Sequence, residues 1–336
     1  MYETRNETVV QPHSRAAVPG SCDWCHRGAV VCVAVNARST QAMLDQLCAL
    51  LTNAIAAVVD VADADAAWAT PAAHSLAGRE LTAEEMRRPE PRTGSWPWLG
   101  APLTARWALW AMIEEAKALP ALLRSDVTSY AADVLCRAVL ESASLAWWLL
   151  DPDIDAQRRG ARWLVYRLHS AKETEKAVQA LELGPGEDQS GYGESVADVQ
   201  QEIEDLGWSE ARGSVMFGGN KESWLGYTDR AAKLVGNIWP QGGLPYRELS
   251  AVAHAELLGL TRHLIAMQAG TPRPRPAPGP ATALWLWRDS YLVLGAQVLT
   301  ADRAAGFLGL DSQAATLHAL IQYLNRALPA LRPTGP

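Results

Sequence analysis

The chain lacks most of the features that identify common protein classes. Its longest apolar runs, such as 29–35 and 145–150, are much shorter than the roughly 18–20 residues that cross a bilayer, so we expect no membrane contact. Residues 1–19 contain no apolar core of signal-peptide length, which indicates a cytoplasmic protein. Phosphate-binding glycine loops, dinucleotide-binding fingerprints, Gly-x-Ser-x-Gly and His-Glu-x-x-His are absent. No histidine lies three residues after a glutamate, as di-iron helices require.

Cysteine is scarce and unevenly placed. Three of the five cysteines, Cys22, Cys25 and Cys32, lie with His26 in an eleven-residue stretch that offers four soft metal ligands. Structural zinc sites usually join two ligand pairs, and the chain has no second Cys-x-x-Cys and no His-x-x-x-His pair. An odd cysteine count also argues against a disulfide framework. We therefore expect reduced thiols and no cofactor, with zinc at these four residues as the alternative.

The chain has no excess of positive charge. Its net charge of −7 and pI near 5.6 argue against an extended phosphate-binding surface, although a local basic patch remains open. The basic residues are 25 arginines and only 5 lysines. This balance is typical of a chain encoded by GC-rich bacterial DNA.

Helical periodicity is what the chain does contain. From residue 39 apolar side chains recur at spacings of three and four, and Leu103, Trp107 and Trp110 share one helical face. Further helices are predicted over 125–150, 154–183, 194–206, 227–239, 246–268, 281–307 and 312–328. At most one strand is expected, at 29–35, and strands do not alternate with helices. These patterns predict an all-α, multi-helix bundle.

Breaks in the periodicity divide the chain. We expect an irregular N-terminal arm (1–38), a main helical domain (39–270), a proline-rich spacer (271–280) and a C-terminal helical pair (281–336) packed on the main domain. Alternating prolines in the spacer favour polyproline II. The polar, glycine-bearing stretch 184–223 holds only one predicted short helix, and we interpret it as a lid-like part or a plain surface excursion.

Polar residues recur on two of the predicted helices. Arg247, Ser250 and His254 form one strip on helix 246–268 with apolar surface on both sides, which is typical of a cleft, an interface or a buried hydrogen-bond network. Arg137 and Glu141 lie one turn apart on helix 125–150. The plain structural interpretations are a histidine satisfied by neighbouring helices and a surface ion pair.

These residues carry a resemblance. The stretch 135–152 has Arg-x-x-x-Glu on a helix that ends in Trp-Trp-Leu-Leu-Asp-Pro, 158–162 reads Arg-Arg-Gly-Ala-Arg, and 246–254 has Tyr-x-x-Leu-Ser-x-x-x-His. Over about 130–265 the chain resembles a bacterial family of uncharacterised helical proteins. That family is similar to the HEPN (higher-eukaryote and prokaryote nucleotide-binding) domains.

The resemblance implies a function. Many HEPN domains are metal-independent ribonucleases of toxin and defence systems that act as homodimers on RNA. Their Arg-x4–6-His signature corresponds to Arg247 and His254, with His254 as general acid or base and Arg247 stabilising the phosphorane. Tyr246, Ser250, Arg137 and Glu141 would form a supporting network. Glu248 departs from the family, which often places Asn, Asp or His after the arginine.

Two other functions remain open. The chain has 14 tryptophans and only 2 phenylalanines, and tryptophan joins large apolar area to an N–H donor, which suits a ligand pocket in a helical bundle. The residues expected around such a small-molecule site are Trp107, Trp110, Trp147, Trp148 and Trp163. A non-catalytic interaction protein is the third possibility, with the proline-rich spacer docking to an aromatic groove.

Overall fold

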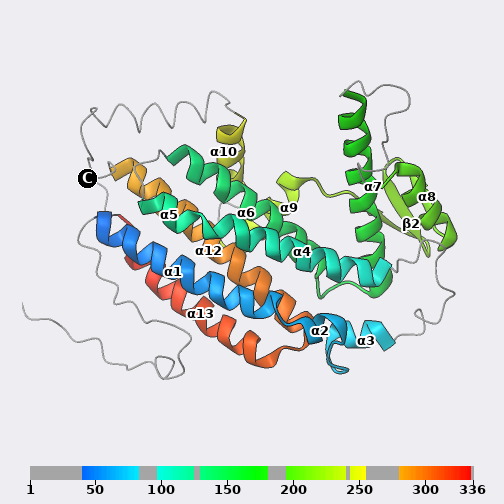
Figure 1. Cartoon of the computed structure of the whole chain (residues 1–336), viewed down its shortest axis with the longest axis horizontal. Helices are drawn as coiled ribbons and strands as arrows, with labels where there is room; N and C mark the ends of the chain where they lie inside the picture. The colour runs from blue at the N-terminus through cyan, green and yellow to red at the C-terminus, as the bar shows by residue number, and fades with distance from the viewer. Residues whose placement is uncertain are drawn as a thin grey trace, which may run out of the picture. The chain divides into compact units, whose positions relative to one another are not determined.

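The computed structural model describes residues 40–82, 97–124, 129–180, 194–239, 243–254 and 280–333 (Figure 1). All of them belong to one compact unit, Val33–Pro336. Helices dominate this part of the chain, which confirms the all-α, multi-helix fold class. The predicted arm, its strand and the spacer up to residue 279 lie outside the described residues.

Three long helices run side by side: α1 (Thr40–Ala62), α12 (Pro280–Leu308) and α13 (Asp311–Ala330) (Figure 1). Their apolar side chains recur every three or four residues, and the stripes face one another in a continuous core. Among the described helices α1 alone is long and apolar enough to cross a membrane, and half of its most apolar stretch is buried within the protein. Its buried side chains lie in the same core cluster as those of α12.

The other side of the core is formed by α4 (Pro97–Lys117) and α6 (Ser129–Leu149), which contact each other and α12. The buried face of α4 is rich in alanine, which permits close approach to α6. The face that carries Leu103 and Trp107 is the exposed one, since Trp107 is 68% exposed. The helical face predicted from Leu103, Trp107 and Trp110 is therefore not the face that packs into the core.

Short helices connect these long ones. α2 (Asp65–Ala69) and α3 (Leu76–Thr82) follow α1, and α5 (Leu119–Arg124) follows α4. Pro120 is the second residue of α5, where proline is tolerated because the first turn of a helix does not need its amide hydrogen. These connections bring Glu80 on α3 close to the turn that follows α6.

Helix α7 (Ala156–Ala180) leaves the bundle and supports a small sheet beside α8 (Val196–Asp205) (Figure 1). Strands β1 (Ser209–Ala211), β2 (Ser214–Phe217) and β3 (Asn220–Ser223) pair antiparallel in the order β1-β2-β3. The expectation of at most one strand is wrong here.

Two tight turns explain the sheet. Arg212 and Gly213 between β1 and β2, and Gly218 and Gly219 between β2 and β3, all have positive φ values. Two consecutive residues with positive φ form the turn that matches the twist of a two-residue hairpin. Gly213, Gly218 and Gly219, which belong to the stretch interpreted as a lid or a surface excursion, form hairpin turns, and β2 packs on α7.

Two further helices, α9 (Tyr227–Gly236) and α10 (Leu244–Ala253), pack on α6 and on each other. Pro245 is the second residue of helix α10, and His254 follows the last residue of the helix. The predicted continuation to residue 268 lies outside the described residues. This arrangement brings the polar strip of α10 over the polar residues of α6.

Candidate functional site

The α6–α10 contact brings together four of the residues singled out from the sequence. Arg137 Nε donates to Glu141 Oε1 at 2.6 Å, one turn along α6. The Tyr246 hydroxyl, at the start of α10, donates to the same Glu141 oxygen at 2.7 Å. Arg137 Nη1 lies 3.0 Å from His254 Nε2, at the other end of α10. We call these four residues the α6–α10 site.

The hydrogen bonds assign the proton of the imidazole. A guanidinium only donates, so His254 Nε2 accepts from Arg137 and the ring proton lies on Nδ1. Since His254 is exposed, its ring is accessible to a molecule from solution.

Burial and charge shift two pKa values in the site. Burial alone would lower the pKa of Arg137, but the hydrogen bond and charge of Glu141 outweigh it, so the pKa is raised. Burial and the Glu141 contact raise the pKa of Tyr246 to about 12. Both groups therefore keep their protons near neutral pH, and Glu141 accepts from two fixed donors.

Arg247 and Ser250 lie two turns and one turn before His254 on α10. Arg247 is exposed and Ser250 is half-buried, and the structure does not join either side chain to the four bonded residues. Glu248, the departure from the HEPN pattern, forms an ion pair with Arg288 of α12. Its negative charge is therefore compensated locally.

Glu115 of α4 is a neighbour of the site that the sequence reasoning missed. Its Oε1 accepts from the Ser142 hydroxyl at 3.2 Å, and its Oε2 is buried without a hydrogen-bond partner among the described residues. Burial raises the pKa of Glu115, and the charge of Glu141 adds to the shift. The available signal was Glu115 on the inward side of an otherwise apolar helix.

Arg230 of α9 is a second missed residue near the site. It is 1% exposed, and its guanidinium lies 4.3 Å from the Trp224 ring and 4.9 Å from the Tyr227 ring. Only Nη1 is hydrogen-bonded, to the Leu225 carbonyl, while Nε and Nη2 have no partner in the described chain. Burial lowers the pKa of Arg230 to about 10. The aromatic rings take the place of a counter-ion.

The five tryptophans that the sequence predicts around one pocket lie in different surroundings. Trp107 is exposed, and Trp110 is half-buried on the same helix. Trp163 packs against Gly100, where a Cβ atom would lie 2.1 Å from the ring, and Trp148 faces Trp224. Trp147 lines a cleft with Pro152, Arg303 and Phe307.

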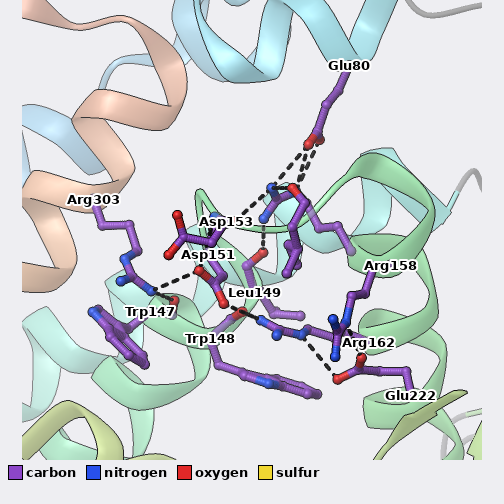
Figure 2. A network of polar contacts seen from close by, with 12 residues as sticks. Glu80, Trp147, Trp148, Leu149, Asp151, Asp153, Arg158, Arg162, Glu222 and Arg303 are labelled. Carbon is purple, nitrogen blue, oxygen red and sulfur yellow. Dashed lines mark hydrogen bonds and ion pairs between the residues drawn. The ribbon is translucent and has the colours of Figure 1, made fainter. Parts of the chain in front are cut away.

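A larger polar network surrounds the turn between α6 and α7 (Figure 2). The last carbonyls of α6 accept from three arginines: Trp147 from Arg303 at 2.7 Å, Trp148 from Arg162 at 2.7 Å, and Leu149 from Arg159. Cations at these carbonyls also match the negative end of the helix dipole. The arginines come from α12 and α7, so the end of α6 is fixed by two other helices.

Carboxylates complete this network. Arg159 is fully buried and forms an ion pair with Glu80 at 3.1 Å. Arg162 pairs with Asp151 at 3.0 Å and with Glu222 of β3 at 3.2 Å, which ties the small sheet to the bundle. Burial would raise the pKa of Asp151, but hydrogen bonds from Arg162 and the Asp153 amide lower it overall. The arginines of the 158–162 motif thus have structural partners.

Metal binding finds no support in the described parts of the chain, where no three His, Cys, Asp or Glu side chains gather as metal ligands. Cys22, Cys25, His26 and Cys32 lie outside the described residues. No family model, curated protein or solved structure matches the chain.

Proposed function

We propose that the protein cleaves RNA without a metal ion, with a HEPN-like helical core and the α6–α10 site as its catalytic centre. The observation that carries the proposal is the exposed His254 ring, whose Nε2 lies 3.0 Å from Arg137 Nη1. An imidazole and a guanidinium from different helices offer a base and a phosphate ligand at one accessible place. These are the two groups that RNA cleavage requires when no metal takes part.

The reaction divides among these groups. A phosphate beside Arg137 competes for its Nη1 donor and frees His254 Nε2. That nitrogen takes the proton of the ribose 2′-hydroxyl, the 2′-oxygen forms a bond to phosphorus, and the bond from phosphorus to the 5′-oxygen breaks. The products are a 2′,3′-cyclic phosphate and a 5′-hydroxyl, whose proton comes from water or from His254 of a second copy in a homodimer.

The other residues position these groups. Glu141 holds the Arg137 side chain by its Nε, and Tyr246 fixes the same carboxylate from α10. Arg247, exposed two turns before His254, is the second cation for the phosphate. Because Glu248 is paired with Arg288, its charge does not oppose a phosphate at full strength.

Cleavage of a fluorescently labelled single-stranded RNA by the full chain, with EDTA present, tests the proposal. We expect His254→Ala to lower the cleavage rate by at least about 100-fold, the lower end for loss of a general acid or base. His74→Ala is the matched control, since His74 is also an exposed histidine and lies near α3. It should leave the rate unchanged.

A DNA of the same sequence should not be cleaved, because it lacks the 2′-hydroxyl. Equal rates for His254→Ala and His74→Ala, or cleavage that disappears with EDTA, would contradict the proposed mechanism. Because His254 is exposed, its removal should not lower the unfolding midpoint, and circular dichroism at 222 nm checks this point.

A further inference from the structure

A cleft lies next to the arginine network of Figure 2 and shares none of its lining residues with the α6–α10 site. The cleft has a volume of about 350 Å³ and lies between α12, the end of α9 and the turn after α6. Its lining is Leu76, Trp147, Pro152, Asn237, Leu299, Asp302, Arg303, Gly306 and Phe307. This volume lies at the lower end of the range for small-molecule sites, about 300–1,000 Å³.

Arg303 is one of the residues that line this cleft. Its guanidinium lies 3.8 Å from the centroid of the Trp147 ring, and its Nη1 donates to the Trp147 carbonyl. Within the described structure Nε and Nη2 have no hydrogen-bond partner, and they lie on one edge of the guanidinium. This edge matches the two oxygens of a carboxylate. The contacts with Trp147 hold the guanidinium in place before a ligand arrives.

The positive charge of Arg303 is incompletely balanced. The nearest carboxylate is that of Asp151: its Oδ1 is 4.0 Å from Arg303 Nη1, and its Oδ2 pairs with Arg162. Burial and the nearby charges of Arg162 and Arg159 lower the pKa of Arg303 more than Asp151 and Asp153 raise it. A negatively charged group at the free edge would restore the balance.

Gly306 keeps the cleft open. It lies in α12 one turn after Asp302, and a Cβ atom built on it would have no neighbour within 4 Å. A glycine inside an exposed stretch of helix costs about 1 kcal/mol relative to alanine. Close packing does not account for this glycine, and any larger side chain would project into the cleft.

The remaining lining limits the ligand. Leu299, Phe307 and Pro152 provide apolar walls, and the stacked pair of Arg303 and Trp147 provides a flat surface. Asp302 also lines the cleft, with its Oδ1 3.5 Å from His318 Nε2, and its negative charge disfavours a dianion such as a phosphate monoester. A ligand with a single carboxylate on a flat apolar body pairs with the charge of Arg303 and is repelled less by Asp302 than a dianion is.

We propose that this cleft binds a small planar monocarboxylate, with the carboxylate on the Nε–Nη2 edge of Arg303 and the apolar body over Gly306. The proposal does not depend on the RNA-cleaving function. It assigns a small-molecule role to Trp147 alone of the five tryptophans expected at such a site.

Isothermal titration calorimetry of the full chain with benzoate, 1-naphthoate and indole-3-carboxylate tests the proposal. We expect saturable binding of at least one of them below about 1 mM, as the size of fragment ligands allows. The neutral 1-naphthylmethanol should bind at least about tenfold more weakly than 1-naphthoate, because it cannot form the charged bidentate contact.

Two variants locate the site. Gly306→Leu adds a side chain to the lining of the cleft at a position where a Cβ atom meets no neighbour, and leucine favours the helix, so the variant should fold as well as the wild type and bind at least about tenfold more weakly. Arg303→Gln should weaken binding as much, whereas Arg326→Gln, an exposed arginine on α13, should not. His254→Ala should bind normally, which separates this site from the RNA site.

Three results would overturn the proposal. One is the absence of saturable binding for all three carboxylates. Another is equal affinity of Gly306→Leu and the wild type. The third is equal affinity for 1-naphthoate and 1-naphthylmethanol.

Discussion

Replacing Arg159 by methionine should cost the protein much of its stability. The Arg159 side chain is fully buried, pairs with Glu80 and donates to the carbonyls of Leu149, Asp151 and Ile154. Methionine fills a similar apolar volume but leaves the Glu80 carboxylate without this counter-ion and three carbonyls without this donor. Breaking a buried ion pair from one side costs about 3–5 kcal/mol, so we expect a loss of about 4 kcal/mol.

The adjacent residue offers a matched control. Arg158 pairs with Glu222, but its side chain is 50% exposed and Glu222 keeps Arg162 as a partner. Arg158→Met should therefore cost less than about 1 kcal/mol. The two variants differ by one position on α7 and remove the same charge, so their comparison measures the contribution of the buried ion pair and carbonyl contacts of Arg159.

Urea unfolding followed by circular dichroism at 222 nm measures both losses. Thermal unfolding gives a second measure. With an unfolding entropy of about 2.1 cal/mol/K per residue over roughly 300 residues, a loss of 4 kcal/mol lowers the thermal unfolding midpoint by about 6 °C. Adding Glu80→Gln to Arg159→Met should recover about 1 kcal/mol or more, because an unpaired amide costs less than an unpaired carboxylate. If the losses of unfolding free energy for Arg159→Met and Arg158→Met differ by less than about 1 kcal/mol, the buried Arg159 pair does not stabilise the fold as proposed.

Two other buried groups should respond differently. Arg230→Met should change the free energy of unfolding by no more than about 1 kcal/mol. Arg230 has no carboxylate within 4 Å among the described residues, so the variant loses mainly contacts with aromatic rings. A loss as large as that of Arg159→Met in the same urea assay would contradict this prediction. Glu115→Gln should stabilise the protein more at pH 7 than at pH 4. Burial raises the pKa of Glu115, so wild-type stability falls as pH rises through the folded pKa, whereas near pH 4, below the unfolded value of about 4.3, the carboxyl is largely protonated in both states. An equal effect of Glu115→Gln at both pH values would contradict the predicted burial effect.

Periodicity predicted the long helices well, because a core-facing stripe is a local property of the sequence. It failed on α4, where small alanines form the buried face and Trp107 lies outside. It also failed on the sheet, since β1 and β3 are short, polar and half-exposed. The paired glycines at 218 and 219 were the available signal for a hairpin, and they were interpreted as a surface excursion.

Some contacts of the candidate site follow from the sequence, and others depend on how the helices pack. Arg137 and Glu141 are one turn apart on a helix, so their contact follows from spacing alone. The contact between Arg137 and His254 joins residues 117 positions apart and depends on how α10 lies on α6. Glu115 had only its place on the inward side of its helix as a signal, and Arg230 comes from a helix that carries no motif, so packing shows which residues they contact.

The arginine network has a consequence for how the chain is made. Arg303 follows Trp147, whose carbonyl it binds, by 156 positions. At about 5–20 residues per second, a ribosome needs about 8 to 30 s to add that length. For this interval α6 has emerged without α12, the helix that covers its apolar face and helps to cap its end. Nascent chains that stop before residue 280 should therefore bind chaperones or aggregate, and the bundle becomes stable only near the end of synthesis.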